Sequence, residues 1–396
     1  MTLVPLSMAP PLHGTRRPYQ PQKAVSTASA ADRGRSRATL DPTMAAVTDS
    51  ARRLTSLADV AERAGVSVAT ASRVLSKSDY PVAPETRQRV LDAAADLDFS
   101  PNLIARGLVA QRTYLIGLVV QAVTGEHDAL FARGVEDIAT ENDFSVVVCS
   151  TDDDPARELH VIRQFRSLRT DAVIYGCSSA CHAADEEELV TQLRRIEEAG
   201  GILVRVAPHP GLAPDVSFSM REALSIGVKH LVDLGHERLA LVTGPELSGS
   251  ARVARHAIGE ILERHGLDRE PAAVLPGLLD HAGGQAAGRT LVDRRVPVTA
   301  VLATDDRLAI GVQQALIGAG MSVPDDVSVM GIDDIPSASI VTPALTTVRV
   351  PRRELGRLAM QTAIWLLGGG ARMGRNNVGV ELVVRGSTGP APRHDP

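Results

Sequence analysis

The chain has 396 residues, of which 44% are hydrophobic and 22% are charged. This length predicts two or three domains, and the composition is typical of a water-soluble globular protein with an ample core. The sequence contains no apolar run of the ~18 residues that indicate a membrane-spanning helix. Its three cysteines are too few for a disulfide scaffold and suit a reducing compartment, so we expect a cytoplasmic protein.

The net charge of −5 is unevenly distributed along the chain. Basic residues outnumber acidic ones in residues 1–112, whereas acidic residues dominate in residues 113–396. The negative total argues against a protein that merely coats nucleic acid. The asymmetry permits a nucleic-acid-binding region at the start of an acidic body.

Residues 1–53 contain scattered prolines, arginines and serines without hydrophobic periodicity, which predicts a disordered N-terminal tail. A start that is rich in arginine and serine and poor in acidic residues also resembles a transit peptide, although it lacks the apolar segment of a secretion signal. Translation that begins at Met44 is the alternative, and the sequence leaves open whether residues 1–43 are translated.

Residues 54–99 carry the start and stop signals of three short helices. Ser56 can cap the first helix, and Gly65 suits the left-handed residue that ends it. Ser67 can cap the second helix, and Pro84 suits the first turn of the third. Short helices joined in this way predict a helix-turn-helix head.

Residues 100–112 form a predicted linker with one short helix of its own. Ser100 can cap this helix, and Pro101 can occupy its first position. A helix of this length is marginal in isolation, so we expect it to become ordered only where a partner holds it.

Residues 113–388 alternate apolar strands with helices, and residues 389–396 form a C-terminal tail. This alternation predicts parallel sheets that are covered by helices on both faces, and the number of strands fits two sheets better than one. We expect strands at residues 115–120, 145–149, 172–175, 202–206, 239–242, 300–303 and 327–331.

The second predicted helix of the head has small side chains that would allow it to approach the major groove of DNA closely. Val68 or Ala69 can contact a thymine methyl group, and Arg73 can bind guanine in a bidentate manner. The alternative is an ordinary helical hairpin with a solvated arginine, which helix geometry alone does not exclude.

Three segments of the N-terminal region carry a resemblance: residues 57–75 (LADVAERAGVSVATASRVL), 86–87 (TR) and 100–108 (SPNLIARGL). Together they resemble the head and hinge helix of the lactose-repressor/galactose-repressor family of bacterial transcription regulators. The resemblance implies a sequence-specific, DNA-binding repressor. Two heads of a homodimer would bind a pseudo-palindromic operator in double-stranded DNA.

The resemblance also implies roles for individual residues. Val68, Ala69 and Arg73 would read operator bases, and Leu108 would insert between base pairs from the minor groove and kink the DNA. The alternative for Leu108 is a core leucine of an ordinary linker. The other candidates for DNA binding, chiefly through phosphates, are Ser67, Thr70, Ser72, Asn102 and Arg106.

The body resembles the same family in residues 230–236 (HLVDLGH), 323–328 (VPDDVS), 331–334 (GIDD) and 343–348 (PALTTV). These segments imply a periplasmic-binding-protein-like body of two Rossmann-like subdomains, with an effector in the cleft between them. We place its three crossovers near Ala207, Pro336 and Asn376. The N-subdomain would comprise residues 113–206 and 337–375, and the C-subdomain would comprise residues 207–336 and 376–388.

In the family an arginine and an aspartate grip the effector. Arg252 and Asp306 occupy those positions, and Ser248 lies nearby in the sequence. Ligands of open parallel sheets lie beyond the carboxyl ends of the strands, which is where polar residues are found in this chain. The alternative for each residue is a solvated loop charge.

The segment after the first strand departs from the family pattern. Sugar-binding members have Asn-Pro-Phe-Phe there, whereas this chain has residues 125–128 (GEHD) and therefore no aromatic ring to stack on a sugar. We take His127 and Asp128 as effector-binding candidates. They predict a polar or charged metabolite, or a sugar bound without stacking; a weak or absent effector response is the alternative.

Other chemistries lack their signatures. Cys177, Cys181 and His182 offer three metal ligands, but no fourth ligand stands at a characteristic spacing, so we expect no metal. The motifs of nicotinamide enzymes, serine hydrolases and zinc proteases are missing, so we expect neither an enzyme nor a cofactor. A ligand-binding transport protein shares the body fold, but it would need a secretion signal and no head.

The sequence therefore predicts a cytoplasmic, homodimeric repressor that has no membrane segment and whose DNA binding is coupled reciprocally to effector binding. It leaves open the operator, the effector, whether the effector induces or co-represses, and whether dimers pair into tetramers.

Overall fold

The computed structural model describes residues 55–75, 80–100, 112–176, 183–206, 215–246, 249–372 and 376–392. The chain divides into two compact units, residues 1–100 and 101–396. Among the described helices, none combines the length and the apolar character that a membrane span requires. Several predictions fall outside the described residues: the tail, the roles of Asn102, Arg106, Leu108 and Ser248, and the Cys177–His182 segment.

The head is built from α2 (Leu57–Ala64), α3 (Val68–Leu75) and α4 (Pro84–Asp96). Ser56 and Asp59 cap the start of α2 reciprocally, and Gly65 ends it with a φ of 63°. The Ser67 hydroxyl accepts a hydrogen bond of 3.1 Å from the Thr70 amide at the start of α3. A small aliphatic core holds the three helices together, and its buried members are Val60, Ala61, Ala64, Ala71, Val74, Val90, Ala93 and Ala94.

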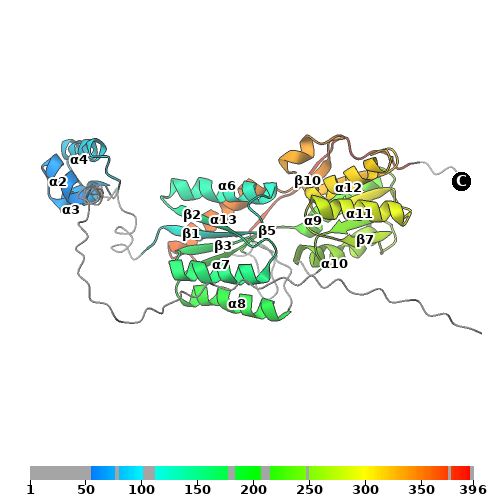
Figure 1. The fold of residues 1–396 in the computed structure, drawn as a ribbon, viewed down its shortest axis with the longest axis horizontal. Helices are drawn as coiled ribbons and strands as arrows, with labels where there is room; N and C mark the ends of the chain where they lie inside the picture. Colours follow the sequence, from blue (N-terminus) through cyan, green and yellow to red (C-terminus); the bar gives the residue numbers. More distant parts are fainter. Residues whose placement is uncertain are drawn as a thin grey trace, which may run out of the picture. The chain divides into compact units, whose positions relative to one another are not determined.

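The first lobe of the body surrounds a parallel sheet in the order β2-β1-β3-β4. Helices α6 and α13 cover one face of this sheet, and α7 and α8 cover the other (Figure 1). The elements are β1 (Leu115–Val120), α6 (Glu126–Glu141), β2 (Ser145–Ser150), α7 (Pro155–Leu168), β3 (Ala172–Tyr175), α8 (Ala183–Glu198), β4 (Ile202–Arg205) and α13 (Arg352–Leu367).

The second lobe surrounds a sheet in the order β12-β10-β9-β8-β6-β7, in which only β12 runs antiparallel to its neighbour. Helices α9 and α10 pack on one face, and α11 and α12 pack on the other. The elements are α9 (Met220–Asp233), β6 (Leu239–Thr243), α10 (Gly249–Arg264), β7 (Ala273–Pro276), α11 (His281–Asp293), β8 (Ala300–Ala303), α12 (Asp306–Gly318), β9 (Ser328–Asp333), η1 (Pro336–Ser339), β10 (Thr346–Arg349) and β12 (Glu381–Val383).

Both sheets are double-faced, which explains why their strands are apolar at consecutive positions rather than at alternate ones. In β1, Leu118 packs toward α6 and α13, whereas its neighbour Val119 packs toward α7 and α8. In β6 every residue is buried. The fold therefore has one hydrophobic layer on each face of each sheet.

The chain crosses between the lobes three times, and the second crossover differs from the sequence prediction. Strands β5 (Val216–Phe218) and β11 (Asn376–Val378) pair in parallel and carry two crossovers. The second crossover, which we predicted near Pro336, is instead at Val350 and Pro351, between β10 and α13. The prediction is wrong because β10 pairs with β9 and extends the second sheet, so that residues 337–349 belong to the second lobe.

His236 joins the C-terminal segment at Gly389 to the second lobe, and we expect it to make the stability of the fold depend on pH. The ring is fully buried, with Nδ1 3.0 Å from Thr299 Oγ1 and Nε2 3.1 Å from the carbonyl oxygen of Gly389. Burial lowers the pKa of His236 below its ordinary value of 6.5. Below this pH the unfolded chain takes up a proton that the folded chain resists, so the free energy of unfolding should fall by up to ~1.4 kcal/mol per pH unit.

Urea denaturation between pH 7 and pH 5 measures this dependence directly. The wild-type chain should lose stability as the pH falls, and the His236→Gln variant should have a flatter profile because glutamine does not titrate. Other titrating groups are common to both chains and cancel in the difference. Parallel profiles would show that His236 binds its proton equally well in both states.

Candidate nucleic-acid interface and interlobe cluster

Helix α3 presents an exposed face opposite its packed face. Ala71 and Val74 are buried in the head core, whereas Val68 is 49% exposed. Of the other predicted DNA-binding residues on this helix or at its cap, Thr70 is half-buried and the exposed ones are Ser67, Ala69, Ser72 and Arg73. The predicted base-reading side chains therefore lie on the accessible side of one helix.

Arg73 has an aromatic partner that the sequence did not reveal. Its guanidinium carbon lies 4.2 Å from the centroid of the Tyr80 ring, and Tyr80 itself is 54% exposed. A cation–π contact at such an exposed site contributes roughly 0.5–1 kcal/mol and limits the rotamers of the arginine. An exposed tyrosine beside Pro81 is the only local signal, and a loop position alone does not predict the stacking.

In the first lobe, the two predicted effector-binding residues lie at the start of α6, beyond the carboxyl end of β1. Only 7% of His127 and 6% of Asp128 is exposed. The Asp128 carboxylate accepts a hydrogen bond of 2.8 Å from the Ala122 amide, and its other oxygen lies 3.5 Å from His127 Nε2. The backbone after β1 thereby holds Asp128, and Asp128 in turn lies against the imidazole.

In the second lobe, two further carboxylates lie beyond the ends of β8 and β9. Asp305 caps α12 and forms an ion pair with Arg307, whose Nη2 is 2.8 Å from Asp305 Oδ2. Asp333 ends β9 and accepts a hydrogen bond of 2.9 Å from Nε of Arg352, the first residue of α13. All four side chains are largely buried, so each charge depends on its partner.

These residues meet where the two lobes touch. One ligand atom each from His127, Asp305 and Asp333 lies within 4.8 Å of the other two. Glu126 adds a direct contact between the lobes, since its carboxylate accepts a hydrogen bond of 3.0 Å from the Ser337 amide. We call this group the interlobe cluster; its members are His127, Asp128, Asp305, Arg307, Asp333 and Arg352.

The electrostatics of the interlobe cluster follow from burial and from the two arginines. Burial raises the pKa of Asp333, although Arg352 opposes the shift. Burial also works against the ionised form of Asp305, but Arg307 outweighs it and holds the pKa of that carboxyl below its ordinary value. Asp333 has a φ of 130°, a conformation that L residues seldom adopt and that is concentrated at functional sites.

Asp306 does not lie where the sequence suggested. The residue is fully buried, one carboxylate oxygen accepts a hydrogen bond from Thr347, and the other accepts one of 3.0 Å from the Ile335 amide. Burial, reinforced by the charge of Asp333, raises the pKa of Asp306 to about 8. Both oxygens serve the packing of α12 on the sheet, so the neighbouring Asp305 is the better candidate for a ligand contact.

The remaining described effector candidate is Arg252. Arg252 is exposed on the first turn of α10, a helix that packs against α9. Sequence reasoning also missed Arg307 and Arg352 as members of the cluster. The available signal for Asp305 and Asp333 was their position beyond the carboxyl ends of strands in a parallel sheet.

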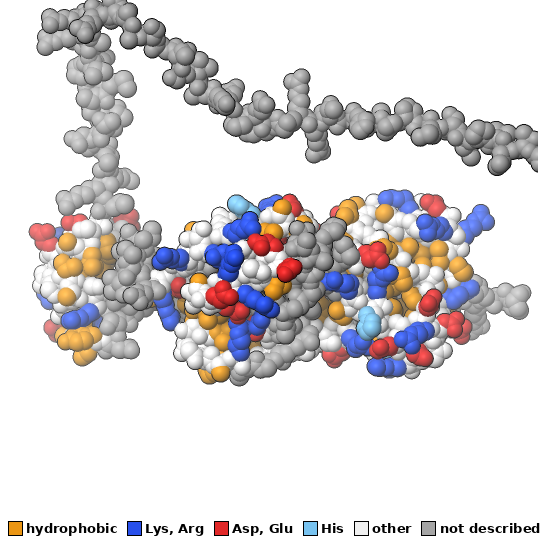
Figure 2. Space-filling model, turned by 90° about the horizontal axis from the view of Figure 1, so that it is seen from below, with side chains coloured by type: hydrophobic (Ala, Val, Ile, Leu, Met, Phe, Trp, Pro, Cys, Tyr) orange, Lys and Arg blue, Asp and Glu red, His pale blue; other side chains and the backbone are white. Residues whose placement is uncertain are grey.

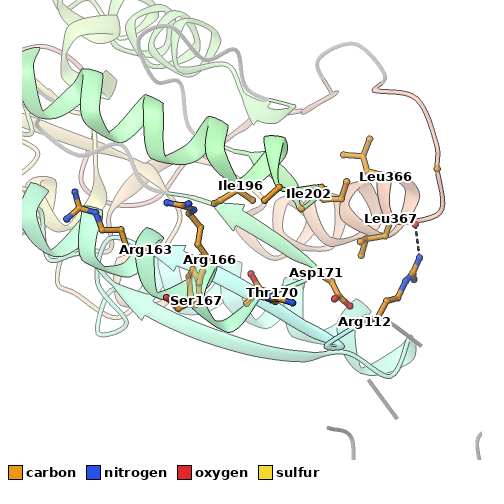
Figure 3. A pocket seen from close by; sticks show the side chains of 16 residues that line it. Arg112, Arg163, Arg166, Ser167, Thr170, Asp171, Ile196, Ile202, Leu366 and Leu367 are labelled. Atoms are coloured by element: carbon orange, nitrogen blue, oxygen red, sulfur yellow. Dashed lines mark hydrogen bonds between the residues drawn. The ribbon is translucent and has the colours of Figure 1, made fainter. Parts of the chain in front are cut away.

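A cavity lies at the opposite end of the first sheet, before β1, β3 and β4 (Figure 3). Its volume is about 860 Å³, and Arg112, Arg163 and Arg166 are among its lining residues. These arginines already have partners: the carbonyl oxygen of Leu367, the Glu188 carboxylate and the side-chain oxygen of Gln192. This cavity is therefore a weaker candidate for a ligand site than the interlobe cluster.

Charged side chains on one face of the body do not form a broad basic surface. Figure 2 shows lysines and arginines interspersed with aspartates and glutamates among the side chains that it colours. A mixed surface of this kind gives little long-range attraction to DNA. The described part of this face of the body therefore offers no second candidate for the nucleic-acid interface, and α3 of the head remains the candidate.

Comparison with known proteins covers both units. Residues 56–102 match the family described as bacterial regulatory proteins, lacI family, and residues 228–388 match the periplasmic binding protein-like domain. The ribose operon repressor of Escherichia coli (strain K12) is 31% identical over 311 residues, which is 78% of this chain and 92% of that protein.

Solved structures are similar over most of the chain. The lac repressor dimer bound to operator and the anti-inducer ONPF has a TM-score of 0.74 at 27% identity and covers 85% of this chain and 100% of that chain. A regulator from Enterococcus faecium with bound ribose has a TM-score of 0.59 at 25% identity, over 70% of this chain and 99% of that chain. The predicted fold class, a helical head with a periplasmic-binding-protein-like α/β body, is confirmed.

Proposed function

The chain belongs to the lacI family of bacterial regulatory proteins, and on this premise we propose how its residues divide the work of a DNA-binding repressor. The head recognises an operator through α3, and a small molecule acts at the interlobe cluster to change DNA binding. The observation that carries the proposal is the accessible face of α3, from Val68 to Arg73, above a buried core. The protein is a regulator and not an enzyme.

In the proposed DNA complex, α3 lies in the major groove. Val68 and Ala69 are short enough to let the helix approach thymine methyl groups, and the planar fork of Arg73 matches O6 and N7 of guanine. The first turn of α3 carries no acidic residue, so its N-terminus attracts phosphate. Ser67, Thr70 and Ser72 make the phosphate contacts that orient the head.

The remaining DNA contacts come from the hinge. We assign Asn102 and Arg106 to the DNA backbone and Leu108 to the step that is kinked from the minor groove. The lac repressor structure similar to this chain is a dimer bound to operator, and we propose the same assembly here, with two heads on two half-sites. A repressor acts on chromosomal DNA, so we place it in the cytoplasm.

In the proposed control step, the effector binds between the lobes. The contacts that join the lobes there, Glu126 with Ser337 and Arg352 with Asp333, are the ones that a ligand would strengthen or replace. When the lobes move relative to one another, the first lobe changes its position. The linker joins this lobe to the head, so the change reaches the DNA-binding helix. The coupling is reciprocal: the effector changes operator affinity by the same factor by which operator changes effector affinity.

The cluster indicates the class of the effector. Its buried charged groups suit a polar or charged metabolite, which can be hydrogen-bonded by carboxylates and guanidinium groups. A relative binds ribose, so a sugar held by hydrogen bonds alone remains a second candidate. High affinity for a neutral sugar, together with a clear response of operator binding, would favour the second candidate.

Selection of DNA from a random library by the purified full chain tests the function. We expect enrichment of a two-fold symmetric site, whose half-sites are then the operator. Repeating the selection with a panel of sugars and charged metabolites identifies the effector as the compound that changes the enrichment. Absence of enrichment under every condition would contradict the proposal and leave the body as a ligand-binding module.

A further inference from the structure

We propose that the interlobe cluster binds one divalent transition-metal ion, with His127 from the first lobe and Asp305 and Asp333 from the second lobe as ligands. The proposal rests on the function inferred above, because it names the chemistry of the ligand that acts between the lobes. Its first support is geometric. An imidazole nitrogen and two carboxylate oxygens lie within 4.8 Å of one another, although they come from three separate elements.

The second support is a buried nitrogen without a partner. The His127 side chain is only 9% exposed, and its Nδ1 has no hydrogen-bond partner among the described residues. Such an orphaned polar atom costs free energy unless a ligand satisfies it. Nε2 lies 3.5 Å from the Asp128 carboxylate, so Nδ1 is the nitrogen that remains for an ion.

The arrangement of Asp128, His127 and the ion then resembles a common pattern. A histidine that binds a metal usually donates its other ring N–H to a carboxylate, which fixes the ring orientation and makes the ligating nitrogen more basic. Asp128 is itself fixed by the Ala122 amide at 2.8 Å. It acts as a positioning residue for His127 and does not touch the ion.

The carboxylates keep capacity for an ion despite their arginine partners. Arg352 contacts Oδ1 of Asp333 with both of its hydrogen-bonding nitrogens, which leaves Oδ2 available. Each oxygen of Asp305 already accepts two hydrogen bonds from Arg307, so an ion would bind there in place of the longest of them, the 3.3 Å bond from Nε to Oδ2. The carboxylates of Asp128, Asp305 and Asp333 outnumber the two guanidinium groups by one, so the cluster carries a net negative charge that attracts a cation.

The donor set favours a transition-metal ion such as zinc over the alkaline-earth ions. Imidazole is a ligand of zinc, copper, iron and nickel, whereas calcium and magnesium prefer oxygen ligands alone. One nitrogen and two carboxylate oxygens provide three protein ligands and leave a position for water or a metabolite. An organic effector therefore has an open coordination site through which to bind.

The ion would also link the lobes. His127 belongs to the first lobe, whereas Asp305 and Asp333 belong to the second, so one shared ion adds bonds across the contact between them. This added link couples the metal to the linker and thus to operator binding.

The test measures zinc binding by titration calorimetry, with the metal-stripped full chain in the absence of DNA. We expect one Zn²⁺ per chain, weaker binding of Mn²⁺, and no binding of Mg²⁺ at the same concentration. The variants His127→Gln and Asp333→Asn should each weaken Zn²⁺ binding by at least ~100-fold, and Asp128→Asn should weaken it by ~10-fold, as expected for an outer partner. Cobalt(II) in place of zinc gives an independent absorption signature of the coordination geometry.

A matched control makes the result specific. His160 is exposed on α7, so His160→Gln is the same substitution away from the cluster and should leave zinc affinity unchanged. Failure of the wild-type chain to bind zinc, or equal binding by His127→Gln, would overturn the proposal. Operator binding by metal-free wild type and variants, measured separately, shows that they are folded and tests the proposed function independently.

Discussion

Replacing Gly134 with alanine is expected to lower the free energy of unfolding of the body by about 2 kcal/mol or more. Gly134 lies where α6 crosses α13, and a Cβ placed there would be 1.9 Å from the carbonyl oxygen of Arg353. The contact is reciprocal, since a Cβ on Gly356 would be 2.1 Å from the carbonyl oxygen of Phe131. Backbone atoms cannot rotate away, so the helices must separate.

The sign of the change in stability follows from comparing the cost of overpacking with the gain in helix propensity. Overpacking in a buried contact costs ~1–3 kcal/mol and occasionally more, whereas alanine gains only ~0.5–1 kcal/mol over glycine in a helix interior. The loss should appear as a lower urea midpoint. It should also reach the interlobe cluster, because α6 carries His127 and α13 begins with Arg352, so effector binding should weaken together with stability.

A helical glycine with open space around it provides the control. Gly318 is the last residue of α12, and a Cβ there would have no neighbour within 4 Å. Gly318→Ala should therefore be neutral or slightly stabilising, within about 1 kcal/mol. Equal midpoints for Gly134→Ala and the wild-type chain would show that α6 and α13 can move apart at little cost.

Much of this architecture was predictable because its signals are local. The caps at Ser56 and Ser67, the left-handed Gly65 and the proline at the start of α4 act within a few residues of their position. The apolar strands could be located because burial on both faces removes polar residues from consecutive positions. The second crossover had no such signal, since the pairing of β10 with β9 depends on residues distant in the sequence.

In the candidate site, too, some residues could be predicted from local sequence, whereas others depend on the three-dimensional structure. His127 and Asp128 stood out because they depart from the family pattern, and the structure brings them to the contact between the lobes. The choice between Asp305 and Asp306 could not be made from the sequence. Adjacent side chains at a helix start point in different directions, so only the three-dimensional position of α12 turns Asp305 toward His127 and Asp306 toward Thr347.

Replacing Arg73 with alanine is expected to weaken operator binding by about 1–3 kcal/mol per half-site, or roughly 5- to 150-fold, and to relax discrimination at one base pair. A bidentate guanidinium contact specifies guanine because it uses O6 and N7 together, whereas loss of the fork removes that preference and leaves other positions intact. The stack on Tyr80, with 4.2 Å between the guanidinium carbon and the ring centroid, orients this fork before DNA arrives.

Two further variants distinguish recognition of a base by Arg73 from general attraction of its positive charge to DNA. Arg73→Lys keeps the charge but loses the fork, so discrimination at that base pair should fall while the salt dependence of binding stays close to that of the wild type. Arg63, on α2, is 60% exposed in its side chain and forms a salt bridge of 3.0 Å with Asp96. Arg63→Ala removes one charge from the head without altering α3, so it should leave the base preference unchanged.

Affinity measured for operators with each base pair substituted symmetrically in both half-sites decides the assignment. Arg73→Ala should flatten the profile at one position only. A uniform loss at every position, with the slope of log affinity against log salt reduced by ~1 per half-site, would place Arg73 on a phosphate. Base reading would then depend on Val68 and Ala69, whose contacts with methyl groups distinguish thymine far less strictly than a guanidinium fork distinguishes guanine.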